Sequence, residues 1–498
     1  MEEYRQEIVL GSVIIYLVFC IVVGLWAMRR TRSANDFFVA GRSLGPIVVS
    51  LALFSSTLSG FGFVGGPGLV YSMGLSSLWM VMVSALGYSV GFFLVAKRIR
   101  MIAELRDTLS LPDLVAARYN SETVRFMMAG TIVLGVMGYL ATQILAMALV
   151  LKVILAGTAM FADVSLVICV VLSSTVLIFY CVTGGIIASV YTDVVQGSIM
   201  MIAGVLILIA ATNVFEGGMQ QASEIIMAND SEAIMPFGTA GIIACLGWFF
   251  VFGLGLAGQP HLITKMMMNR RIRDFRIILP LSTIAYVLAA LLWISIGVVM
   301  RAAVISGDIP PLEAADAASP AFLGMFAHPL LAGIVFAGLF AAIMSTSDAF
   351  LNIGAAALVH DMPKAIRGRR VKNELFWARI ATVVLSVVAA VFALYSYYQN
   401  DRLVALLGAF GWATFAAAIV PVVVIGLNWK RANAMGAIAA ITISLLINFS
   451  FEIFSVRLPY GISGPFVAFI ASMTLFIVVS LLTPERKLDR DIDRVMTI

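Results

Sequence analysis

Thirteen apolar runs occupy most of the 498-residue chain, and almost all of them are long enough to cross a bilayer. A transmembrane helix needs about 20 mainly apolar residues, and backbone groups in lipid must bond within their own segment. The chain is therefore expected to be an all-α polytopic membrane protein with thirteen transmembrane helices. The runs lie at 8–28, 44–71, 78–96, 126–156, 164–180, 192–211, 240–262, 277–300, 330–360, 376–396, 403–427, 433–452 and 464–482.

The charged residues predict how these helices are oriented. Only 12% of the residues are charged, and the basic ones gather in loops after odd-numbered runs, such as Arg30, Lys265 and Lys364. Loops on the other side carry acids instead, such as Glu216 and Glu232. Since basic loops stay inside, the N-terminus is expected outside and the C-terminus inside. The net charge of +5 comes from these loops, so no nucleic-acid partner is expected.

Two of the runs are interrupted at mid-membrane. In the second run, residues 51–68 hold four hydroxyl side chains followed by five glycines and Pro67. In the seventh run, residues 251–261 hold three glycines before Gln259 and Pro260. Proline and glycine both disfavour a helix, and a broken helix survives in lipid only where its freed carbonyls are buried or bind something. Hard oxygen ligands of this kind suit a cation.

The interruptions lie five runs apart, which predicts a 5+5 inverted repeat. Each half opens on a broken helix, and an odd number of helices turns the second half upside down. The expected divisions are an N-terminal helix and loop at 1–43, the first repeat at 44–211, an external loop at 212–239, the second repeat at 240–427, and two accessory helices with a tail at 428–498.

A cation site is expected where the ninth run meets the first break. Ala342, Ser345 and Thr346 follow the i, i+3, i+4 spacing of one helical face. Their one carbonyl and two hydroxyls, with carbonyls of the broken second run, would make a five-oxygen cage for a monovalent cation. Alternatively, the hydroxyls bond to carbonyls of their own or a neighbouring helix.

Two acidic residues suggest a second cation site. Asp348 lies in the ninth run, and a charged group there costs about 2.5–3.5 kcal/mol, so a function is expected. Asp193 begins the sixth run, where Thr192 or Asp193 could instead cap the helix. Asp193, Asp348 and Ser345 together are a candidate site toward the inside.

Solute-binding candidates lie at the two breaks and in the fourth run. Unwinding of the second run would turn its side chains toward the centre, while Gln143 and Gln259 could bind a solute or bridge helices. An aromatic before the second break could cover the pocket or serve only for packing. The candidates are Ser56, Thr57, Ser59, Phe61, Gln143, Phe252 and Gln259.

Five segments resemble the sodium:solute symporters, a family that includes carriers of proline, pantothenate, acetate, sugars and sialic acid. The segments are DFFVAGRSLG, GFVGGPGLVYSMGL, TGGIIASVYTDVVQG, GLAGQPH and AAIMSTSD, and they span nearly the whole chain. The resemblance implies the LeuT-type fold. It also implies that sodium is bound by backbone oxygens of Ser55, Leu58 and Ala342 and by the hydroxyls of Ser345 and Thr346. Members with a second sodium use an acid matching Asp193 and groups near Asp348.

The resemblance implies sodium-coupled symport of a small organic solute by alternating access. Four positions, Thr57, Phe61, Phe252 and Leu256, depart from the Asp, Trp, Trp and Tyr that proline carriers look to have. A small carboxylate or amino acid is expected, with pantothenate-, acetate- and proline-like molecules as candidates. A proton-coupled symporter and a solute-binding membrane sensor remain alternatives.

No catalytic motif such as a Ser-His-Asp set is evident, so the chain is not expected to be an enzyme. No cofactor is expected besides a sodium ion as the coupling ion. The expected partners are sodium, a small solute and the lipid bilayer, with no obligatory protein partner evident. The expected location is a bacterial plasma membrane.

Overall fold

The structure, a computed structural model, describes residues 4–156, 161, 163–399, 404–454, 456 and 458–497, without the side chains of 61, 81, 399 and 404–410. Over those residues the chain is helical, and its one β-bridge pairs Leu44 with Asn269. Of these helices, ten are long and apolar enough to cross a membrane, and two shorter apolar ones cover Pro46–Thr57 and Gly411–Ile425.

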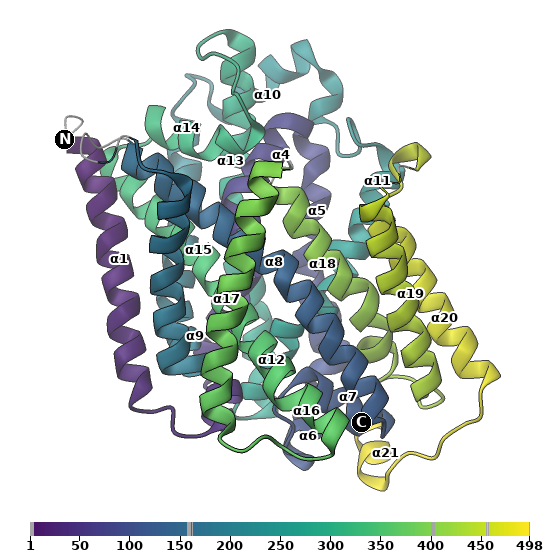
Figure 1. Cartoon of the computed structure of the whole chain (residues 1–498). Coiled ribbons are helices and arrows are strands. Elements are labelled where there is room, and N and C mark those ends of the chain that lie inside the picture. Colours follow the sequence, from purple (N-terminus) through teal and green to yellow (C-terminus); the bar gives the residue numbers. More distant parts are fainter. Residues whose placement is uncertain are drawn as a thin grey trace.

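In the described residues, the first twelve α-helices include α12, which directly follows the second break (Figure 1). They are α1 (Arg5–Met28), α2 (Ala34–Val39), α3 (Pro46–Thr57), α4 (Gly66–Met73), α5 (Leu78–Gly91), α6 (Lys97–Leu105), α7 (Leu111–Tyr119), α8 (Glu122–Ala156), α9 (Leu166–Thr212), α10 (Gly218–Asn229), α11 (Gly241–Trp248) and α12 (Pro260–Met268).

The remaining α-helices form the second part of the bundle. They are α13 (Phe275–Ser306), α14 (Ala318–Met325), α15 (Pro329–Ala356), α16 (Met362–Arg367), α17 (Glu374–Gln399), α18 (Val404–Val420), α19 (Ala434–Ile453), α20 (Gly464–Leu482) and α21 (Arg490–Met496).

Both predicted interruptions are present. Between α3 and α4, Leu58 is non-helical, with φ −88° and ψ 87°. A π-helical turn, η3, follows at Phe61–Gly65. Between α11 and α12, η7 is a π-helical turn at Phe249–Gly253, and η8 is a 3₁₀-helical turn at Leu254–Gly258. Proline cannot continue a helix from its N-terminal side but starts one well, and Pro260 is the first residue of α12.

The fifth and sixth predicted runs both belong to α9, which turns sharply between them at Gly185, where φ is +53°. Only glycine adopts this backbone cheaply, and a Cβ there would also lie 2.5 Å from the Phe37 ring. Thr192 and Asp193 lie inside α9, so neither caps a helix.

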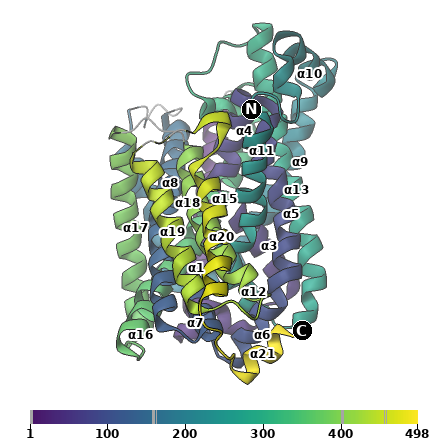
Figure 2. The same ribbon diagram turned by 90° about the vertical axis from the view of Figure 1, so that its right-hand side faces the viewer.

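The packing places the first break at the centre of the bundle. Helix α3 packs against α9, α12, α13 and α15, while α1 packs on α9 and α15 at one edge of the bundle. Helices α19 and α20 pack on each other and on α18 at the opposite edge (Figure 1). The start of α1 lies at the same end of the bundle as α10, while α6, α7 and α21 lie at the other end (Figures 1 and 2).

Candidate functional site

The end of α3 meets the middle of α15, and hydroxyl groups make the contact. Ser345 Oγ donates to the Ser55 carbonyl at 2.9 Å and to the Ala342 carbonyl at 3.0 Å. Thr346 Oγ1 donates to the Ser56 carbonyl and to the Ala342 carbonyl, each at 3.1 Å. All five residues are buried. Three carbonyl oxygens and two hydroxyls therefore converge where α3 ends.

The sequence left two alternatives open, an oxygen cage for a cation and hydroxyls bonded to helix carbonyls, and this arrangement is compatible with both. The hydroxyls of Ser345 and Thr346 bond to the Ala342 carbonyl of their own helix and to carbonyls of α3, which brings five oxygens together. Oxygen ligands without a carboxylate suit a monovalent hard cation. The Ser56 carbonyl, which the sequence assigned no role, belongs to this group. Leu58 lies at the break beside it, and its backbone oxygen as a ligand stays a prediction.

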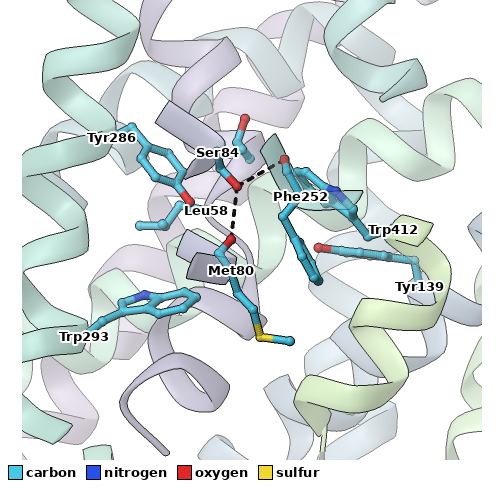
Figure 3. A pocket seen from close by; sticks show the side chains of 10 residues that line it. Leu58, Met80, Ser84, Tyr139, Phe252, Tyr286, Trp293 and Trp412 are labelled. Atoms are coloured by element: carbon cyan, nitrogen blue, oxygen red, sulfur yellow. Dashed lines mark hydrogen bonds between the residues drawn. The ribbon is translucent and has the colours of Figure 1, made fainter. Parts of the chain in front are cut away.

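A small aromatic-lined cavity lies next to the break (Figure 3). It encloses about 20 Å³, which is room for about one water molecule. Ser84 donates hydrogen bonds to the Met80 carbonyl at 3.2 Å and to the Phe252 carbonyl at 3.5 Å, and so ties α5 to the second break. The lining residues are Thr57, Leu58, Gly62, Met80, Ser84, Tyr139, Phe252, Tyr286, Trp293 and Trp412.

A second, larger cavity of about 900 Å³ shares Met80 and Phe252 with the small one. Its other walls come mainly from α8, α17 and the neighbourhood of α19 and α20. The side chains of Met80 and Phe252 therefore separate the larger cavity from the small cavity beside the first break.

The predicted solute residues are distributed unevenly around the small cavity. Thr57 and Phe252 line it, and the Ser59 hydroxyl lies 2.9 Å from that of Tyr139, which also lines it. Gln143 Oε1 accepts from the Gly60 backbone N–H at 2.9 Å, while its Nε2 is buried with no hydrogen-bond partner among the described residues.

Two further candidates, Ser56 and Gln259, do not line the cavity. The Ser56 hydroxyl bonds back to the Ala52 carbonyl of its own helix at 2.9 Å. Gln259 Nε2 donates to the Trp412 carbonyl at 3.2 Å and so links the second break to α18. The side chain of Phe61 lies outside the described residues. Sequence reasoning missed Tyr139, Tyr286, Trp293 and Trp412, because an aromatic in an apolar run looks the same whether it lines a cavity or packs.

A lysine lies beside Asp193, and the sequence analysis placed it wrongly in an inner loop. Lys265 belongs to α12 and is 2% exposed, while Asp193 is fully buried. The ammonium lies 2.7 Å from Asp193 Oδ2 and donates to the Ala52 carbonyl at 2.8 Å. Ser55 Oγ donates to the other carboxylate oxygen at 2.9 Å. The sequence did contain a sign that Lys265 lies in a helix, because a proline often starts one and Lys265 follows Pro260 by five residues.

The second predicted acid, Asp348, faces α9. It accepts hydrogen bonds from Ser189 Oγ at 2.7 Å and from the Tyr180 hydroxyl at 2.8 Å. The hydrogen-bond partners of Asp348 therefore differ from those of Asp193. Both side chains are buried, Asp193 on α9 and Asp348 against it.

Another ionic cluster lies at the end of the bundle that carries α7 and α16, where Asp113, His360 and Asp361 could in principle hold a metal. Asp113 instead accepts from His360 and Lys364, each at 2.7 Å, and also pairs with Arg125. Burial raises the pKa of Asp113, but the His360 hydrogen bond and the nearby positive charges outweigh it and hold this pKa well below its usual range. These basic groups satisfy the carboxylate, so the cluster is a set of ion pairs that fastens α7 to α8 and α16.

Comparison of the sequence with known proteins gives one consistent family. A model of the sodium:solute symporter family matches residues 37–444. The osmoregulated proline transporter OpuE of Bacillus subtilis is 27% identical over 480 residues, which is 94% of each chain. Sodium/proline symporter 2 of Staphylococcus saprophyticus is 28% identical over 505 residues, covering 98% of this chain and 95% of its own.

Solved structures show the same fold. A Na⁺-coupled sialic acid symporter, solved in a substrate-bound outward-open state, has a TM-score of 0.79 and 18% identity over 97% of this chain and 99% of its own. MHP1, a nucleobase-cation-symport-1 family transporter in a closed conformation, has a TM-score of 0.56 and 14% identity over 93% of this chain and 98% of its own. The LeuT-type fold that the family resemblance implied is confirmed at this level.

Proposed function

Because the chain belongs to the sodium:solute symporter family, we propose that its sodium ion binds between α3 and α15 and that its solute is a small carboxylate or amino acid. Members of this family are transporters rather than enzymes. The observation that carries the sodium site is the pair of hydroxyls of Ser345 and Thr346, which donate to carbonyls at the very end of α3.

The sodium ligands are the backbone oxygens of Ser55, Leu58 and Ala342 and the hydroxyls of Ser345 and Thr346. Helix α3 stops at Thr57, so its last carbonyls lack the helical partners that they would have in a continuous helix. A cation between α3 and α15 would replace the hydroxyl-to-carbonyl bonds with oxygen-to-cation contacts and would fasten the broken helix to its neighbour.

The solute binds at the break beside the aromatic cavity. One feature supports a solute with an acidic group. Gln143 Nε2 is buried at the break with no hydrogen-bond partner among the described residues, so it can donate to a carboxylate. Proline is the first candidate because the two relatives at 27% and 28% identity are named as proline transporters.

Counting the helices by their turns supports the proposed membrane topology. Helix α9 counts as two spans because it turns at Gly185. Helices α3 and α4 form one broken span, α5 and α6 form the next, and α18 is a further span. With the remaining long helices this count supports thirteen spans, and the basic loops support an N-terminus outside and a C-terminus inside. The relatives are bacterial, which supports a plasma membrane as the location.

Transport follows an alternating-access cycle. Sodium enters from outside, joins α3 to α15 and orders the solute pocket, and the loaded bundle then opens to the inside. The membrane potential contributes about 2.3 kcal/mol for each charge moved through 100 mV, before the concentration gradient is added.

Proton coupling is a second candidate because Asp193 and Asp348 are both buried in the bundle. Uptake driven by a pH gradient in sodium-free buffer would select it. A membrane sensor of the same fold would bind solute without moving it across the membrane of a proteoliposome.

A thermal-stability screen tests the proposed function. Purified protein is melted with proline, acetate, pantothenate and other small carboxylates, each in sodium chloride and in choline chloride of equal ionic strength. A ligand that binds the folded state raises the melting temperature. We expect at least one carboxylate to stabilise the protein only when sodium is present, and equal stabilisation in choline would reject sodium coupling.

A further inference from the structure

A protein ammonium group lies inside the bundle beside one of the two acids predicted for a second cation. Lys265 and Asp193 are buried almost completely, at 2% and 0% exposure, and their charged atoms are 2.7 Å apart. A buried charge is stable only when it is paired and hydrogen-bonded. The pair therefore exists because each group compensates the other.

The surroundings of the ammonium have the same chemistry as a cation site. Its oxygen neighbours are the Asp193 carboxylate and the Ala52 carbonyl, at 2.7 and 2.8 Å. Ammonium is a compact point charge with three donors, and it can be held by the oxygens that would hold a metal cation. We propose that Lys265 is a tethered cation that takes the place of a second sodium ion, so that one sodium ion accompanies each solute molecule.

The buried charges agree with a single ion. Lys265 and Asp193 bring one positive and one negative charge together, so the pair leaves no net negative charge for a second sodium ion to balance. A second sodium ion beside this pair would add an uncompensated charge in a buried region, which is unfavourable.

The lysine is also linked to the proposed sodium site by a short series of contacts. Ser55 Oγ donates to Asp193, while the Ser55 carbonyl accepts from Ser345 Oγ. The ammonium thus holds the carboxylate that positions Ser55, whose carbonyl is a proposed sodium ligand. This inference rests on the proposed function, since it concerns how many sodium ions that function uses.

Removing the ammonium provides the test. Lys265→Met leaves the Asp193 carboxylate without its positive partner, and a second sodium ion is expected to replace the ammonium. Lys265→Arg keeps the charge, and Lys265→Met combined with Asp193→Asn removes both members of the pair. Both of the latter variants are expected to bind one sodium ion per protein.

The measurement is the number of sodium ions bound per protein, obtained with sodium chloride alone. Equilibrium binding of radioactive sodium to purified protein gives this number, and the rise of melting temperature with sodium concentration, against choline chloride, gives it independently. The expected number of sodium ions bound per protein is about 1 for the wild type and about 2 for Lys265→Met.

Each outcome separates this inference from the proposed function. Two bound ions in the wild type would overturn the tethered cation while leaving sodium symport intact, and this result needs no variant to fold. One bound ion in a Lys265→Met protein that sodium still stabilises would also overturn it. No sodium binding in the wild type would overturn the proposed function and this inference together.

Discussion

The hydroxyls of Ser345 and Thr346 each serve a carbonyl of their own helix and a carbonyl of α3. A sequence can show that two hydroxyls share a helical face, and the i, i+3, i+4 spacing did so here. It cannot show which carbonyls they will meet, because that depends on where the neighbouring helix stops. The contact with Ser55 and Ser56 became visible only in the structure.

Gln143 gives a prediction at the scale of one side chain. Its Oε1 holds the Gly60 N–H, and its Nε2 has no partner among the described residues, so Gln143→Ala removes both an anchor of the break and a proposed donor to the solute. A hydrogen bond to a charged group contributes about 1.5–3 kcal/mol, so the KM for the solute should rise by about 10- to 100-fold.

The matched control on the same helix is Thr131→Ala, because that buried hydroxyl bonds only to the Met127 carbonyl in its own helix. Uptake into proteoliposomes of the solute found in the stability screen gives both KM values. Equal KM values for the two variants would remove Gln143 from the solute site.

At the scale of elements, some features were predictable from the sequence and others were not. The break between α3 and α4 was predictable because proline and glycine at its centre disfavour a helix through short-range effects. Lys265 was misplaced because basic residues usually mark loops, whereas this one ends a short helix buried against α3. The turn at Gly185 falls between the fifth and sixth predicted runs, but a single positive φ leaves too little trace in the sequence to place the turn at one residue.

Gly66 at the start of α4 tests this packing. A Cβ at Gly66 would lie 2.1 Å from the Trp293 ring of α13, which lines the small cavity. Gly66→Ala should therefore displace the ring, lower stability by about 1–3 kcal/mol and weaken solute binding. Melting curves with and without solute measure both effects.

Gly130→Ala on α8 is the control, because nothing lies within 4 Å of its added Cβ. That variant should melt at or slightly above the wild-type temperature, since alanine favours a helix over glycine. A Gly66→Ala protein as stable as the Gly130→Ala protein would show that α4 does not need this close contact.

At the scale of the whole molecule, the sequence predicted an all-α membrane protein, the two breaks and the sodium:solute symporter family, and these predictions are confirmed. The reason is that long apolar runs and their interruptions are local patterns with few structural solutions in lipid. The aromatic lining was not predictable, because it collects residues from α8, η7, α13 and α18 that no local pattern connects. The proposed repeat divisions and the membrane orientation stay predictions.

Sodium binding to purified Thr346→Ala and Ser347→Ala proteins tests the central claim most directly. Both hydroxyls lie buried on α15, but Thr346 Oγ1 reaches the Ser56 carbonyl, whereas Ser347 Oγ bonds only to Ile343 of its own helix. Loss of one ligand should raise the half-saturating sodium concentration of Thr346→Ala by about 10-fold or more. Ser347→Ala should match the wild type, and unchanged sodium binding in Thr346→Ala would contradict a cation held between α3 and α15.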